Sequence, residues 1–179
     1  MTWWFWALLV VVLVGLYLSQ VAGRLDRLHI RVDNAATALR TQLLRRASVA
    51  LELASSDLLD PATSLFLAEA AHTARDSSDL DRDEAETDLT TALHAALPDA
   101  ESVAAVAMAA GGSDLVEELE ATTRRVELAK LFHEDAVRQC ASMRSKPMVK
   151  LLHLAGRAAW PEPIDVDASR PDGLASATA

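Results

Sequence analysis

The N-terminal segment of the chain is apolar on every side of a predicted helix. Residues 2–22 carry no charged side chain, and a helix rising about 1.5 Å per residue over this length spans roughly 30 Å, the thickness of a bilayer's hydrocarbon core. The tryptophans Trp3, Trp4 and Trp6 mark one end of the segment, and Tyr17 lies toward the other. Because amphipathic rings settle at the headgroup level of a membrane, this pattern predicts a transmembrane helix over residues 2–22.

After Gly23 the apolar pattern changes from continuous to periodic. Apolar residues recur at spacings of three and four, which is the period of one helix face. The first proline is Pro61, so we expect the membrane helix to run on without interruption to about Ser55 as one long amphipathic helix. Its apolar positions are Leu25, Leu28, Val32, Ala35 or Ala36, Leu39, Leu43, Ala47, Ala50 and Ala54.

Proline and turn residues delimit two helices in the middle of the chain. Asp60 is a good N-cap acceptor and Pro61 suits the first helical position, so a helix is expected to begin there and to end near Arg75. Residues 76–79 predict a turn. The helix that follows is expected to end at Pro98, because proline cannot continue it.

A second long helix is predicted near the other end of the chain. Residues 99–110 predict a short alanine-rich helix, which the two glycines at 111–112 end. Ser113 is expected to cap a helix over residues 114–143. Its apolar stripe needs a partner, and the stripe of the first long helix predicts an antiparallel, coiled-coil-like helical bundle. This second stripe holds Leu115, Leu119, Thr122, Val126, Ala129, His133, Ala136 or Val137, and Cys140.

These patterns predict an all-α protein with three regions. Residues 2–22 form the single transmembrane helix, which continues into a helical bundle over residues 23–157. A short apolar piece over residues 148–154 follows Pro147. Residues 158–179 are rich in proline, aspartate, serine and alanine, and this composition predicts a disordered tail.

The charges that flank the apolar segment predict its orientation. Arg24, Arg27 and Arg31, here called the basic cluster, follow the segment, whereas only the α-amine of Met1 precedes it. The positive-inside rule therefore predicts an outside N-terminus and a bundle in the cytoplasm, anchored to the cell membrane. The alternative is a cleaved signal peptide, because residues 21–23 (Val-Ala-Gly) are compatible with cleavage. Such a peptide normally begins with a basic region, which this segment lacks.

The overall charge argues against nucleic acid as a partner. The net charge is −9, and residues 57–101 alone hold twelve acids and two arginines, a net of −10. So acidic a module does not attract a phosphate backbone. The basic cluster, by contrast, lies where anionic headgroups are found, so it predicts contact with the membrane surface. Its role as a topology determinant explains it equally well.

The search for catalytic or metal-binding motifs identifies none. The histidines are scattered one to a segment, without the i,i+4 pairing of helical metal sites. The single cysteine, Cys140, has no evident base beside it and suits a reducing compartment. We therefore expect no cofactor, no metal and no enzymatic activity. The histidines are His29, His72, His94, His133 and His153.

Two stretches of the chain resemble the LemA family. Residues 27–35 (Arg-Leu-His-Ile-Arg-Val-Asp-Asn-Ala), followed by a double arginine, resemble the start of the family's first helix after its membrane span. Residues 120–137 resemble its C-terminal signature. The resemblance covers most of residues 3 to 167, in the family's order. The motif positions are Val32, Asp33, Asn34, Ala35, Arg45, Arg46, Arg125, Phe132, His133, Ala136 and Val137.

The chain also departs from the LemA pattern in two places. Residues 48–53 lack the proline and asparagine that usually follow the double arginine, and residues 132–134 (Phe-His-Glu) replace the usual Tyr-Asn. These departures indicate a divergent branch. The resemblance implies a membrane-anchored antiparallel helical bundle without established enzymatic activity.

Three functions are compatible with these patterns. The favoured one is a noncatalytic protein-interaction or scaffolding module at the cytoplasmic membrane, which binds an unknown protein partner or a second copy of itself. The second is a lipid-binding or membrane-remodelling protein that uses the basic cluster. The third, least favoured, is an enzyme or sensor with a dispersed site formed by His133, Glu134 and Asp135.

Overall fold

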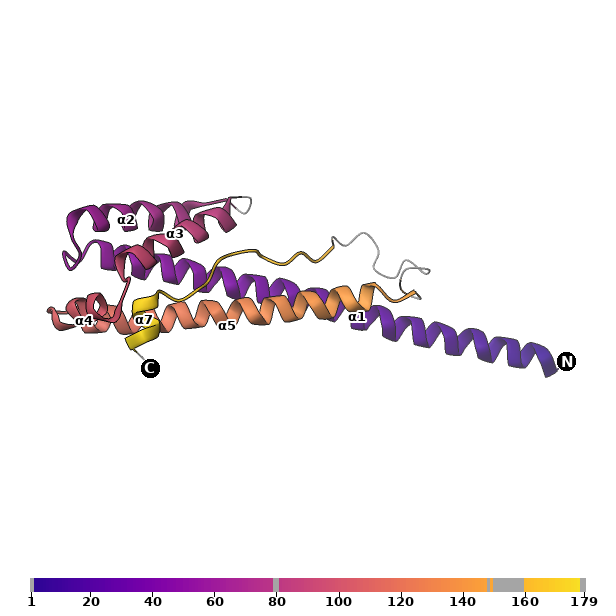
Figure 1. The fold of residues 1–179 in the computed structure, drawn as a ribbon. Helices are drawn as coiled ribbons and strands as arrows, with labels where there is room; N and C mark the ends of the chain where they lie inside the picture. The colour runs from indigo at the N-terminus through magenta and orange to yellow at the C-terminus, as the bar shows by residue number, and fades with distance from the viewer. Residues whose placement is uncertain (1, 79–80, 148, 150–159, 178–179) are drawn as a thin grey trace. The chain divides into compact units, whose positions relative to one another are not determined.

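The computed structural model describes residues 2–78, 81–147, 149 and 160–177, and every regular element in these ranges is a helix (Figure 1). The all-α class that the sequence predicts is therefore confirmed for this part of the chain. The helices are α1 (Thr2–Ala54), α2 (Pro61–Asp76), α3 (Arg82–Ala96), α4 (Ala100–Met108), α5 (Gly112–Arg144) and α7 (Asp172–Ala177).

Helix α1 is a single uninterrupted helix, as the sequence predicts. The side chains of its first apolar stretch, from Trp3 to Tyr17, are exposed all around the helix. Near the N-terminus the helix is long and apolar enough to span a membrane, and its most apolar window has a mean hydropathy of 2.2. Gly23 does not break it.

Of the two N-caps that the sequence predicts, the one at Asp60 is confirmed and the one at Ser113 is wrong. The Asp60 carboxylate accepts hydrogen bonds from the backbone N–H groups of Ala62 and Thr63, both at 3.1 Å, and Pro61 takes the first helical position. Asp99 caps α4 through a reciprocal capping box with Ser102. Ser113 is not the N-cap of α5, because that helix already begins at Gly112.

The chain divides into two compact units, each of which has its own core. The first unit comprises Met1–Ala36 and His133–Pro163, and the second comprises Thr37–Phe132 and Ile164–Ala179. Helices α1 and α5 are each divided between the units, with one segment in the first unit and another in the second. We describe the two units separately.

In the first unit, α1 and α5 pack against each other in antiparallel order. Leu25 of α1 lies in one apolar cluster with Met143 of α5, and Val32 lies in another with Ala136 and Val137. Residues further along α1 thus contact residues that come earlier in α5, as expected for antiparallel helices. The predicted apolar stripes of the two long helices meet in this unit, and Cys140 is part of the same contact.

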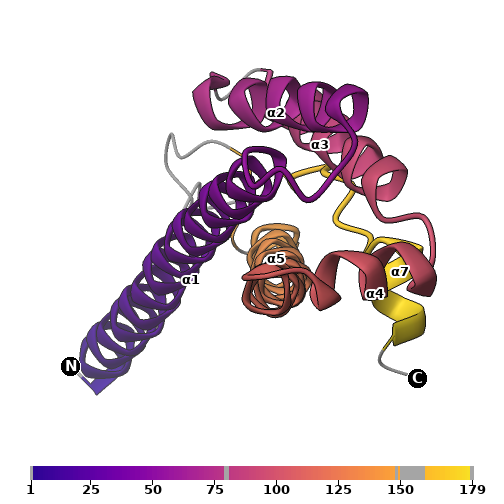
Figure 2. The same cartoon turned by 90° about the vertical axis from the view of Figure 1, so that its left-hand side faces the viewer.

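The second unit has a larger core, built from leucine and alanine. Helices α2 and α3 lie side by side in it, and α4 lies beside α7 (Figure 2). Small side chains allow close approach of the helices, while the leucines fill the space between them. The fully buried leucines of this core are Leu53, Leu67, Leu89, Leu93, Leu97, Leu119 and Leu174.

The disordered tail that the sequence predicts for residues 158–179 differs from the structure over residues 160–177. Val166 and Ala168 pack with Leu39 and Leu43 of α1, and Leu174 of α7 is buried in the larger core. Apolar residues at every second position bury one face of an extended segment, a signal that the proline-rich and aspartate-rich composition masks. Most of the predicted apolar piece 148–154 lies outside the described residues.

Candidate functional site

The aromatic residues of the apolar stretch project outward from α1. Trp3, Trp4, Trp6 and Tyr17 are each more than half exposed. The rings of Trp3 and Trp4 meet edge to face, with 5.3 Å between their centroids. The exposed parts of these rings are available to the surroundings of the helix.

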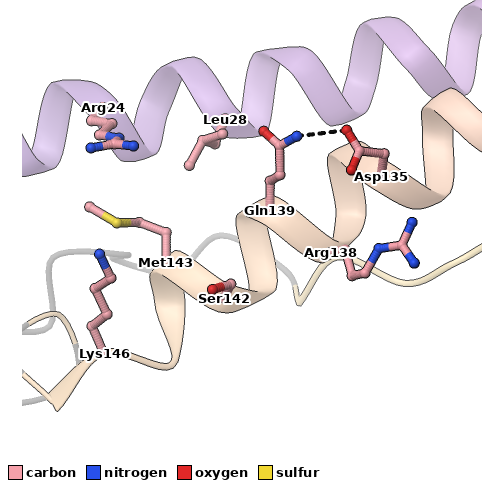
Figure 3. A pocket seen from close by; sticks show the side chains of 8 residues that line it. All are labelled: Arg24, Leu28, Asp135, Arg138, Gln139, Ser142, Met143 and Lys146. Carbon is pink, nitrogen blue, oxygen red and sulfur yellow. Dashed lines mark hydrogen bonds between the residues drawn. The ribbon is translucent and has the colours of Figure 1, made fainter.

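The first unit contains a pocket where the basic stretch of α1 faces the end of α5 (Figure 3). Its volume is about 460 Å³. Within it, the Gln139 amide donates a 2.6 Å hydrogen bond to the Asp135 carboxylate. The only carboxylate among the described lining residues therefore already has a partner. The lining residues are Arg24, Leu28, Asp135, Arg138, Gln139, Ser142, Met143 and Lys146.

A second pocket of about 570 Å³ adjoins the first and shares Arg24, Met143 and Lys146 with it. It lies closer to the apolar stretch of α1. The described residues that line it include three cations and no carboxylate. We call it the juxtamembrane pocket, because it adjoins the segment that the sequence predicts to span a membrane. Its lining residues are Tyr17, Gln20, Val21, Gly23, Arg24, Arg27, Met143, Lys146, Pro147 and Val149.

The three arginines of the basic cluster have different environments in the structure. Arg24 lines both pockets, and Arg27 lines the juxtamembrane pocket while its Nε donates to the Gly23 carbonyl at 3.1 Å. Arg31 lines neither pocket and instead donates to Gln139 at 3.4 Å. Sequence reasoning missed Lys146, because no local pattern links a residue beyond α5 to the start of the chain.

Among the LemA motif positions, the double arginine has two different environments. Arg45 is exposed and forms a surface ion pair with Glu118 at 2.9 Å. Arg46 is fully buried and forms an ion pair with Glu86 of α3 at 2.8 Å. Glu86 is not one of the LemA motif positions. Its place among the buried residues of α3 is the feature that indicates a structural role.

The buried ion pair is a structural feature of the second unit's core. The Nε and Nη1 atoms of Arg46 and the Oε1 atom of Glu86 have no hydrogen-bond partner among the described residues. Burial raises the pKa of the Glu86 carboxyl, and the positive charges of Arg46 and Arg82 oppose this rise. A buried charge that loses its partner is strongly destabilising, so we assign the pair a structural role.

The remaining motif positions divide between core and surface. Val32, His133, Ala136 and Val137 are buried, and Ala35 is half-buried. The exposed positions are Asp33, Asn34, Arg125 and Phe132.

The third possibility from the sequence, a dispersed site of His133, Glu134 and Asp135, has little solvent-exposed surface. His133 is only 2% exposed, while Glu134 and Asp135 are half-buried. Within the described ranges, no group of three or more His, Cys, Asp or Glu residues is arranged to hold a metal ion. Burial raises the pKa of the Cys140 thiol, which keeps it in the unreactive protonated form.

An exposed apolar face on α5 is a candidate for protein contact. Leu128, Leu131 and Phe132 are 47%, 60% and 67% exposed. Their spacing of three and four residues places them on one side of the helix. Sequence analysis missed this face because the stripe it followed is the buried one.

The chain matches no family model, no curated protein and no solved structure. Over the described residues, the fold is that of an all-helical protein, and one of its helices, near the N-terminus, is long and apolar enough to cross a membrane.

Proposed function

We propose that the chain is a single-pass membrane protein, divergent from the LemA family, that holds a noncatalytic protein-interaction module in the cytoplasm. The observation that carries this proposal is the exposure of every large apolar side chain from Trp3 to Tyr17. A helix that is apolar on all sides belongs in a protein core or a membrane. The described protein supplies no core around this stretch, which favours the membrane.

The ends of the stretch support the same proposal. Trp3, Trp4 and Trp6 precede the aliphatic residues and Tyr17 follows them, as interfacial belts do. The exposed cations Arg24 and Arg27 come next. Their position after the span favours a cytoplasmic location for the rest of the chain.

The interaction function rests on the exposed face of Leu128, Leu131 and Phe132. Aromatic and large aliphatic side chains that stay exposed together are typical anchors of protein interfaces. The resemblance of residues 27–35 and 120–137 to LemA motifs supports a noncatalytic role. Phe132 belongs to both the exposed face and the motif.

Thiol labelling tests the membrane orientation. A Ser169→Cys substitution in a Cys140→Ala background puts one exposed thiol on the C-terminal segment. We expect an impermeant reagent to label it only after the cells are opened, because this segment lies in the cytoplasm. Labelling in intact cells would contradict the proposed orientation.

Site-specific crosslinking tests the interaction function. A photoreactive residue at Phe132 of the full chain in native membranes is expected to give a discrete adduct, whereas the same group at the exposed Thr41 of α1 serves as the control. Replacement of Leu128 and Leu131 by serine should remove the adduct. Equal adducts at both positions, or none at Phe132, would exclude this face as the binding surface.

A further inference from the structure

We infer that the juxtamembrane pocket binds the headgroup of an anionic phospholipid. The pocket is lined by Arg24, Arg27 and Lys146 together with Tyr17 and Gln20. This inference rests on the proposed membrane insertion of α1 and goes further, because it assigns a ligand class to a defined set of residues from two parts of the chain.

The position of the pocket along α1 fits a headgroup. Tyr17 lies near the end of the apolar segment, and Arg24 follows it by seven residues, or about 10 Å of helix. Tyrosine rings and basic side chains occupy the headgroup level of a bilayer. If the apolar segment spans the membrane, the pocket therefore opens at the depth of the lipid phosphates.

The charges of the pocket select an anion. Three cations and no carboxylate are found among the described residues that line it. Within the described part of the chain, the side chains of Arg24 and Lys146 have no hydrogen-bond or ion-pair partner, and Figure 3 shows both at the same end of the adjoining pocket. Guanidinium and ammonium groups with free donors bind phosphate oxygens well.

The apolar part of the lining distinguishes a lipid from a free phosphate ion. Val21, Met143, Pro147 and Val149 contribute to the same pocket. Met143 and Val149 also belong to an apolar cluster with Leu25. A free anion gains nothing from these side chains, whereas the glycerol backbone and first acyl carbons of a lipid pack against them.

Lys146 favours lipid binding over the alternative that the basic residues only determine membrane topology. The positive-inside rule explains Arg24 and Arg27 by their sequence position beside the span. Lys146 follows α5 and is more than one hundred residues away from them in the chain, yet it lines the same pocket. A pocket that gathers cations from both regions indicates recognition of a ligand.

Lipid retention by the full chain tests the inference. The test is to reconstitute the protein in nanodiscs with equal amounts of phosphatidylglycerol and phosphatidylcholine and to measure the retained lipids by native mass spectrometry. The natural chain should retain phosphatidylglycerol preferentially. In the double variant Arg24→Gln, Lys146→Gln, this preference should fall by about fivefold for each cation removed.

A matched control removes the same charge elsewhere. The double variant Arg124→Gln, Arg125→Gln changes exposed residues of α5 that line neither pocket, so it should keep the preference. Lys146→Gln alone should lower the preference without changing membrane orientation.

Three outcomes would overturn the inference. The first is an equal loss of preference in the pocket and control variants. The second is no preference in the natural chain despite its insertion. The third is complete displacement of the lipid by inorganic phosphate, which would assign the pocket to the free anion. Failure of the natural chain to enter nanodiscs would instead refute the proposed anchor, and with it the basis for a headgroup ligand.

Discussion

The two ends of α1 show how one helix meets two different physical requirements. Near its start, residues 3–17 are aliphatic or aromatic on all sides and exposed. Near its end, residues 39–53 include both apolar and charged side chains, and the buried apolar ones, including Leu39, Leu43 and Leu53, lie on one side of the helix. The comparison shows that the distribution of apolar residues around the helix, rather than their presence, determines what must cover it.

The largest effect should come from charges placed in the first stretch. Val10→Arg together with Leu13→Arg should release the protein from the membrane, because each arginine near the centre of a span costs about 2.5–3.5 kcal/mol. Alkaline extraction of membranes measures the released fraction. The control is Thr41→Arg with Leu44→Arg, two exposed positions on the second stretch.

These two double variants test the comparison directly. If the stretches differ as proposed, only the first variant changes membrane association, and the control remains in the membrane fraction. Equal release of both variants would mean that overall charge, not the composition of the first stretch, controls association.

The next effect concerns the buried charge pair of the second stretch. Glu86→Leu leaves the Arg46 guanidinium buried and unable to deprotonate, which should lower the free energy of unfolding by about 3–5 kcal/mol. Urea unfolding of the full chain in mild detergent, followed by circular dichroism, measures this change. Adding Arg46→Met to Glu86→Leu should restore most of the loss, since apolar replacements of both partners are tolerated.

The same pair predicts a pH dependence. Burial raises the pKa of Glu86 above its ordinary value of 4.5, so the folded state binds its proton more tightly than the unfolded state does. The resulting stability is fully present below pH 4.5 and is lost as the pH rises through the folded pKa. Arg46→Met removes the opposing positive charge, which should raise the pKa of Glu86 further, enlarge this loss and extend it to higher pH. A flatter profile in Arg46→Met than in the natural chain would contradict the assignment.

Local signals account for the parts of the fold that could be predicted from sequence. The uninterrupted α1 follows from the absence of proline before Pro61, and the cap at Asp60 follows from a side chain that bonds to nearby backbone. The buried stripes of α1 and α5 follow from their helical period. Each of these signals lies within a few residues of the feature it predicts.

The features that sequence reasoning missed depend on contacts between distant segments. The Arg46–Glu86 pair joins α1 to α3, and Lys146 reaches the pocket of Arg24 from beyond α5. The docked segment around Val166 uses a two-residue period in a composition typical of disorder. No pattern in one segment reports which distant segment will cover it, so these contacts required the structure.

The smallest effect should come from single leucine truncations along α1. Leu43 is fully buried, so Leu43→Ala should lower the free energy of unfolding by about 2–5 kcal/mol, through lost transfer free energy and the cavity left behind. Its neighbour Leu44 is exposed, and Leu44→Ala should change it by less than about 0.5 kcal/mol. Leu9→Ala, in the first stretch, should leave urea unfolding of the helical units unchanged, because Leu9 contributes to neither core. A loss for Leu9→Ala as large as that for Leu43→Ala would show that the first stretch is packed against protein, and the proposed membrane environment would then be wrong.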